Sequence, residues 1–122
     1  MSPEVAERAA IMEIDGGIAR PWAEWLAGLD CATDHGAYSA EQWRVLVDDA
    51  VSLVLRWGGR LRTNGWGPAE VSGLVPLIGG RTVTAIGRGD VTVQRDGFPP
   101  EKLFMRPATT GAARWMTDRK AA

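Results

Sequence analysis

The spacing of apolar residues changes once along this chain, and that change limits its fold more than any other feature. Before Gly79-Gly80, apolar residues recur at intervals of three and four, which is the helical period. Beyond this pair, two β-branched runs, residues 81–87 and 90–95, alternate with polar residues as strands do. A third short run, Lys102 to Arg106, follows. The sequence therefore predicts an α+β fold in which N-terminal helices precede a three-stranded antiparallel β-meander.

Two short helices are expected first. Ser2-Pro3-Glu4 combines an N-cap, a proline at the first helical position and an acid in the first turn. The helix that it opens should end near Asp15-Gly16-Gly17. A second helix should begin at Pro21, with an apolar stripe at i, i+3, i+4 and i+7 made by Trp22, Trp25, Leu26 and Leu29. Residues 30–38 are expected to form a polar loop.

The long helix that follows has the clearest start. Ser39 and Gln42 have the spacing of a capping box, in which each side chain accepts a hydrogen bond from the other residue's backbone N–H. An apolar stripe then runs from Trp43 to Leu61, and Asn64-Gly65 supplies a C-terminal cap. We expect this helix to be central to the core, with its apolar side widened by Val45, Val51, Leu53 and Leu55. Residues 68–73 should form one or two further helical turns.

The loop between the first two strands decides which side chains share a face. A two-residue loop, Arg88-Gly89, would place Val91 and Val93 beside Thr82, Thr84 and Ile86. A three-residue loop that also includes Asp90 would instead unite Val83, Ala85, Val91 and Val93. Because the second arrangement makes one apolar face, we expect the three-residue loop.

The length of 122 residues indicates a single domain. Residues 108–122 are expected to be a flexible tail, and Met12 is an alternative start that would leave residues 1–11 as a dispensable extension. No apolar run approaches the ~20 residues that a membrane helix needs, and the N-terminus lacks the apolar core of a secretory signal. These features predict a cytoplasmic protein that does not contact membranes.

The near-neutral total of −1 hides a strong charge asymmetry. Residues 1–55 hold ten acids and three bases, whereas residues 56–122 hold eleven bases and five acids. The two halves either neutralise each other in the fold or present a charged face to a partner. Twelve of the fourteen bases are arginine, the residue better suited to bidentate contacts with phosphate or carboxylate.

Candidate chemistry is sparse. The only cysteine and the only histidine, Cys31 and His35, lie in a stretch without a helical pattern and without further ligands of their kind. Asp48 and Asp49 are neighbours on a helix and point about 100° apart, so we expect them in structural pairs, Asp48 with Arg44. No glycine-rich segment has the spacing of a phosphate-binding loop. We therefore expect no catalytic residues, no metal and no cofactor.

Binding to a partner is the better-supported role. Trp66 and Trp115 fall outside the periodic elements, which makes them candidates for exposed anchors at an interface. Several arginines of the basic half could form one surface, although those at the end of the long helix also suit its dipole. The predicted partner-binding residues are Arg56, Arg60, Trp66, Arg88 and Arg95.

A set of short motifs extends from about residue 40 to residue 106. In order they are Trp43-Arg44, Asp48-Asp49, Gly65-Trp66-Gly67-Pro68, Glu70, Gly73-Leu74 and Gly80-Arg81-x-Val83. In these motifs the chain resembles short uncharacterised proteins encoded in alphaproteobacterial mobile elements and prophages. The resemblance implies an accessory gene in mobile DNA, where small non-enzymatic binders and inhibitors of host systems are common.

The resulting hypothesis is a non-enzymatic protein-binding modulator or inhibitor from a phage or mobile element. Counter-defence, such as anti-CRISPR inhibition of a host effector, is its most concrete form. The alternative is a nucleic-acid-binding regulator that uses the basic C-terminal half, for which a steep fall of affinity with salt would be diagnostic.

Overall fold

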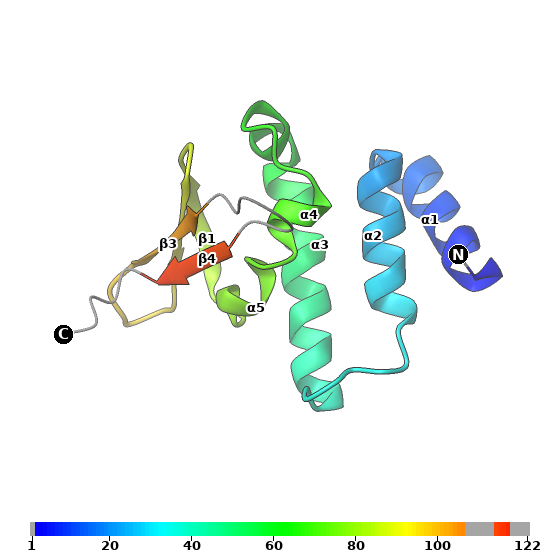
Figure 1. The fold of residues 1–122 in the computed structure, drawn as a ribbon, viewed down its shortest axis with the longest axis horizontal. Coiled ribbons are helices and arrows are strands. Elements are labelled where there is room, and N and C mark those ends of the chain that lie inside the picture. The colour runs from blue at the N-terminus through cyan, green and yellow to red at the C-terminus, as the bar shows by residue number, and fades with distance from the viewer. Residues whose placement is uncertain (1, 107–113, 118–122) are drawn as a thin grey trace. The chain divides into compact units, whose positions relative to one another are not determined.

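The structure is a computed structural model that describes residues 2–106 and 114–117 (Figure 1). Its chain forms two compact units, Met1–Gly58 and Gly59–Ala122. Three helices come first: α1 (Pro3–Gly16), α2 (Arg20–Cys31) and α3 (Ala40–Thr63), the last of which continues across the unit boundary. The second unit adds α4 (Pro68–Val71), α5 (Val75–Ile78), β1 (Thr82–Ile86), β2 (Asp90–Gln94), β3 (Glu101–Arg106) and β4 (Arg114–Thr117).

The α+β class and the order of helices before strands are confirmed. The sheet, however, has four strands in the order β1-β2-β3-β4, with each neighbouring pair antiparallel. The added strand is β4, which lies within the segment expected to be a flexible tail, so that expectation is wrong for residues 114–117. The remainder of the predicted tail lies outside the described residues.

Helices α1 and α2 pack through small side chains. Ala9, Ala23 and Ala27 are fully buried together, and Val5, Met12 and Ile18 surround them. Alanines at a helix contact let the two backbones approach closely, which keeps such short helices together. The first helix ends at Gly16, as expected, because the chain leaves it at Gly17, where φ is +66°.

Two groups of ion pairs supplement the α1–α2 contact. Arg8 of α1 pairs with Asp30 of α2 at 2.8 Å. Arg20, at the start of α2, donates to Glu24 at 3.0 Å and reaches Glu13 of α1 at 3.4 Å. The hydrogen bond with Glu24 is the main cause of a raised pKa for Arg20. Residues 3–11 therefore belong to a helix that packs on α2, and whether they are dispensable stays a prediction.

The expected capping box of α3 is present. The Gln42 N–H donates to the Ser39 hydroxyl at 3.1 Å, and the Ser39 N–H donates to the Gln42 side chain at 2.8 Å. The buried stripe of α3 in the first unit is narrow and consists of Leu46, Ala50, Leu53 and Val54. Val45 and Leu55 are 42% and 60% exposed, so their assignment to the apolar side was wrong.

The C-terminus of α3 ends in a tight cap. The Trp66 N–H donates to the Leu61 carbonyl and the Gly65 N–H to the Arg62 carbonyl, both at 2.9 Å, while Gly65 has φ of +74°. These are the two bonds of a Schellman motif, in which the residue after the glycine packs on the last turn. Leu61 and Trp66 are accordingly both buried.

The loop of the β1–β2 hairpin has two residues, so the predicted three-residue loop is wrong. Ile86 pairs with Val91, and the Gly87 N–H donates to the Asp90 carbonyl across Arg88-Gly89. A register shift between Val83 and Ala85 then restores the apolar face, because Val83 pairs with Val93. This bulge lets Val83 and Ile86, which are three residues apart, join Val91 and Val93 on one side of the sheet.

Candidate binding groove and the predicted contact residues

An open groove of about 670 Å³ lies in the first unit. Its walls come from the end of α2, the loop after it and the first turns of α3. The residues that matter most for its chemistry are Asp30, His35, Glu41, Trp43, Arg44 and Asp48. Val45 also lines it and brings an exposed apolar side chain.

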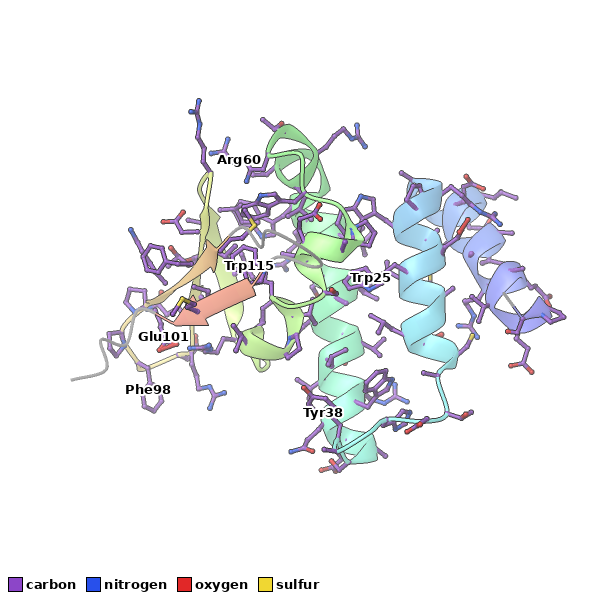
Figure 2. The ribbon with its side chains drawn as sticks, viewed as in Figure 1. Trp25, Tyr38, Arg60, Phe98, Glu101 and Trp115 are labelled. Atoms are coloured by element: carbon purple, nitrogen blue, oxygen red, sulfur yellow. The ribbon has the colours of Figure 1, made fainter. Side chains whose placement is uncertain are left out.

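Aromatic packing holds the loop side of this groove in place. The His35 ring stacks on Trp43 with centroids 4.8 Å apart and planes only 8° from parallel. Tyr38 packs against the same tryptophan at 6.0 Å, and Figure 2 shows it beside the first turns of α3. The Trp43 indole N–H donates to the Leu29 carbonyl at 2.9 Å, which ties α3 to the last turn of α2.

Hydrogen bonds inside the loop complete this arrangement. His35 Nε2 lies 3.0 Å from the Ala32 carbonyl oxygen, so this nitrogen carries the hydrogen. The Gly36 N–H donates to Asp34 at 3.0 Å and the Tyr38 N–H to the His35 carbonyl at 3.1 Å. These contacts hold the loop side of the groove in one arrangement, which lowers the ordering cost of binding.

The charge of the groove is mainly negative. Asp30 is engaged by Arg8, whereas Glu41 and Asp48 are exposed on α3 beside the exposed Arg44. Within the described part of the chain Arg44 and Asp48 form no ion pair, so the expected pair is wrong. The whole first unit has ten acids and four bases, a net charge of −6. Such a surface attracts cationic segments.

Cys31 and His35 are not arranged as a catalytic or metal-binding pair. Cys31 is a half-buried free thiol at the last residue of α2, and His35 is engaged by Trp43 and Ala32. Across residues 2–106 and 114–117, no group of three or more His, Cys, Asp or Glu side chains is placed to hold a metal ion. His35 instead acts as part of the groove wall, a role that sequence reasoning did not foresee.

Among the predicted contact residues, Trp66 is the clear error. It is 4% exposed and packs edge-to-face against Trp115, with ring centroids 5.2 Å apart. Trp115 is half-buried, and its indole N–H donates to the Glu70 carbonyl at 2.7 Å. Both tryptophans therefore join the core of the second unit, so neither is an exposed anchor.

The four arginines of that set have different surroundings. Arg56 on α3 and Arg88 at the hairpin turn are exposed. Arg60 donates to the Ile86 carbonyl at 2.9 Å (Figure 2), and Asn64 donates to the Gly87 carbonyl at 2.7 Å. Arg60 therefore ties the end of α3 to the end of β1, a structural role.

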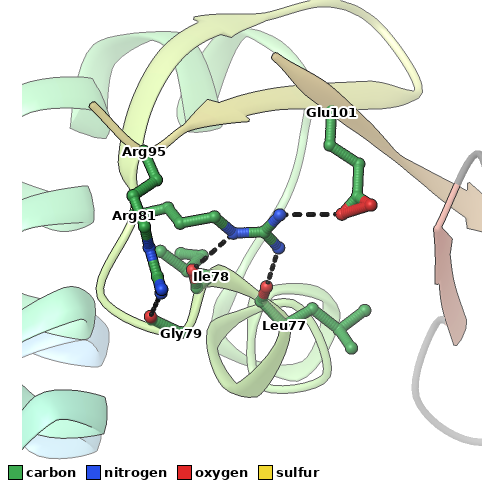
Figure 3. Close-up of polar contacts among 6 residues, drawn as sticks. All are labelled: Leu77, Ile78, Gly79, Arg81, Arg95 and Glu101. Carbon is green, nitrogen blue, oxygen red and sulfur yellow. Dashed lines mark hydrogen bonds and ion pairs between the residues drawn. The ribbon is translucent and has the colours of Figure 1, made fainter. Parts of the chain in front are cut away.

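Arg95 and Arg81 both reach the end of α5 (Figure 3). Arg95 donates to the Gly79 carbonyl at 3.3 Å. Arg81 donates to the Leu77 and Ile78 carbonyls at 2.6 and 3.1 Å and pairs with Glu101 at 2.7 Å. A cation that satisfies the carbonyls at a helix C-terminus is favourable, so Arg81 joins α5, β1 and β3. In the sequence, the only sign of this helix end is that the helical period stops at Gly79-Gly80.

Comparisons with protein-family models, with curated proteins and with solved structures find no match to this chain. In the part of the chain that the structure describes, no helix has the length and apolar character needed to cross a membrane.

Proposed function

We propose that this protein is a non-enzymatic binding module that modulates or inhibits a protein partner, and that the groove of the first unit is its contact surface. The observation that carries this proposal is the groove itself, whose lining combines a packed aromatic wall with two exposed carboxylates. Aromatic and arginine side chains around a recess are typical of the energetic centre of a protein interface. Trp43, Arg44 and Val45 supply that chemistry here.

The charge of the groove indicates the kind of partner. Because Glu41 and Asp48 are exposed and the first unit is strongly acidic, a lysine- or arginine-bearing protein segment would be attracted and retained. A host protein that normally binds nucleic acid has such a basic surface. This fits the counter-defence role proposed from the resemblance to mobile-element proteins, with an effector nuclease as one example of a target.

A pull-down with matched charge variants tests the proposal. The tagged protein is used to capture partners from bacterial lysate treated with nuclease, and captured proteins are identified by mass spectrometry. The groove variant is Glu41→Lys with Asp48→Lys. The control is Glu4→Lys with Glu7→Lys, which makes the same change of charge at exposed positions of α1 outside the groove.

The proposal predicts that the groove variant loses a stoichiometric protein partner that the wild type and the control retain. Two removed carboxylate contacts of about 1–2 kcal/mol each correspond to a loss of affinity of roughly 30-fold or more. Equal loss in both variants would show that only overall charge matters. Retention by both would exclude the groove as the contact surface.

A further inference from the structure

The sheet of the second unit has one face that its own core leaves open. Val91, Val93 and Leu103 are fully buried on the inner face. Since side chains alternate along a strand, the residues between them lie on the opposite side. We call this the outer sheet face and define it by Asp90, Thr92, Gln94, Lys102, Phe104 and Met116.

An aromatic and a thioether side chain lie next to each other on this face. Phe104 and Met116 are register partners on β3 and β4, and they are 38% and 43% exposed. More than a third of each side chain is therefore open to a ligand. Such an exposed pair can support a planar ligand group, which would stack on the Phe104 ring and contact the Met116 sulfur.

Two cations and one acid lie near the pair, since Asp90 is the register partner of Phe104 on β2. Lys102 lies on the outer face, and its contact with Asp90 is long, at 3.8 Å, with the lysine side chain more than half exposed. An exposed pair of this kind contributes little, so Lys102 can exchange Asp90 for another anion. The hairpin turn carries the exposed Arg88, and the Met105 N–H donates to the Gly89 carbonyl at 2.9 Å. This bond places the turn at the end of the sheet where Phe104 lies.

The second unit as a whole has ten bases and five acids, a net charge of +5. Thr92 and Gln94 on the same face offer hydroxyl and amide groups that can bond to the edges of nucleobases.

We propose that the outer sheet face binds single-stranded nucleic acid, with a base stacked on Phe104 and phosphates contacted by Lys102 and Arg88. Aromatic side chains on an open sheet, flanked by cations, are the general means by which proteins bind unpaired strands. A duplex does not expose the faces of its bases and cannot use Phe104. The inference concerns the second unit and does not rest on the function proposed for the groove.

Fluorescence anisotropy with labelled oligothymidine and oligouridine of about 15 nucleotides tests this inference. A duplex of the same length and a polyphosphate serve as competitors. We expect both single strands to bind and to outcompete the duplex, with log Kd against log salt giving a slope of about 1–2 in magnitude. The difference between the two oligomers shows whether DNA or RNA is preferred.

Two variants separate stacking from general attraction. Phe104→Ala should weaken binding roughly 5- to 100-fold, the range for loss of one stacked base. Phe98→Ala is the matched control, because Phe98 is also exposed (Figure 2) but lies in the β2–β3 loop and not on a strand. It should bind as the wild type does.

Three results would overturn the proposal. The first is that no oligonucleotide binds at about 50 mM salt, and the second is that polyphosphate binds as tightly as the oligonucleotide. The third is that Phe104→Ala, with thermal unfolding like that of the wild type, binds the oligonucleotide with unchanged affinity. If Phe104→Ala instead abolished capture of a protein partner while oligonucleotides did not bind, the face would be a protein interface. The groove variant Glu41→Lys with Asp48→Lys should leave oligonucleotide binding intact or slightly stronger.

Discussion

Replacement of Trp115 examines the least expected element of the fold, strand β4. Trp115 contributes a hydrogen bond from its indole N–H to the Glu70 carbonyl at 2.7 Å and an edge-to-face contact with Trp66 at 5.2 Å. The hydrogen bond is worth about 1 kcal/mol, and the aromatic pair about 1 kcal/mol beyond its buried area. The apolar area of a half-buried indole adds about 1 kcal/mol more. Trp115→Ala should therefore lower the free energy of unfolding by about 3 kcal/mol.

Urea unfolding followed by circular dichroism measures this loss. With an m value of about 1–2 kcal/mol/M, the midpoint should fall by roughly 1.5–3 M. Trp115→Phe keeps a ring against Trp66 but removes the donor, so it should lose about half as much.

The neighbouring residue provides the control. Met116 lies on the outer sheet face and is 43% exposed, so Met116→Ala should change the free energy of unfolding by about 0.5 kcal/mol or less. If Trp115→Ala were as mild as Met116→Ala, β4 would not be docked against α4 as described, and the reasoning would be refuted.

Two further stability predictions follow from single side chains. Arg81→Ala removes three contacts of a largely buried guanidinium and should lower the free energy of unfolding in urea by about 2–3 kcal/mol. Replacement of the exposed Arg88 by alanine is the control and should lower it by about 0.5 kcal/mol or less. Equal effects of the two substitutions would contradict the role assigned to Arg81. Ser39→Ala breaks the capping box of α3 and should lower the free energy of unfolding by about 1 kcal/mol, with a loss of helical circular dichroism signal at intermediate urea. An unchanged urea midpoint would show that the cap does not stabilise α3.

Local signals in the sequence identified the parts of the fold that depend on local interactions. The Ser39 capping box, the glycine that ends α3 and the positions of β1 and β2 are set by residues only a few positions apart. The structure has each of them where the sequence predicted it. The boundary between the two units, at Gly58–Gly59, also lies close to the change of charge found near residue 55.

Elements that depend on distant partners were missed. Strand β4 has only four residues, and its alternation becomes meaningful only once β3 is placed beside it. The bulge in β1 allows a two-residue loop and a single apolar face at the same time. Strict alternation of side chains, on which the prediction was based, does not permit both. Trp66 was predicted to be exposed because it lies outside the periodic elements, yet the Schellman motif turns it back onto Leu61.

The groove was missed for a similar reason. Its wall requires His35 to stack on Trp43 and Tyr38 to pack against the same ring at a tilt, and both contacts depend on the conformation of a loop without periodic pattern. Val45 was assigned to the buried side, although a helix with so narrow a buried stripe leaves it in the groove. Side-chain stacking between a loop and a helix leaves no periodic trace in a sequence.

Site-specific photo-crosslinking tests the central claim, that the groove is the surface that binds a protein partner. A photoreactive amino acid replaces Val45 in the groove or, as a control, the exposed Ile14 on α1, and each variant is irradiated in nuclease-treated lysate. The account predicts one dominant crosslinked protein from position 45 and none from position 14, with the crosslink lost when Glu41→Lys and Asp48→Lys are added. Crosslinks from position 14 alone, or a crosslink at position 45 that survives those two substitutions, would contradict it.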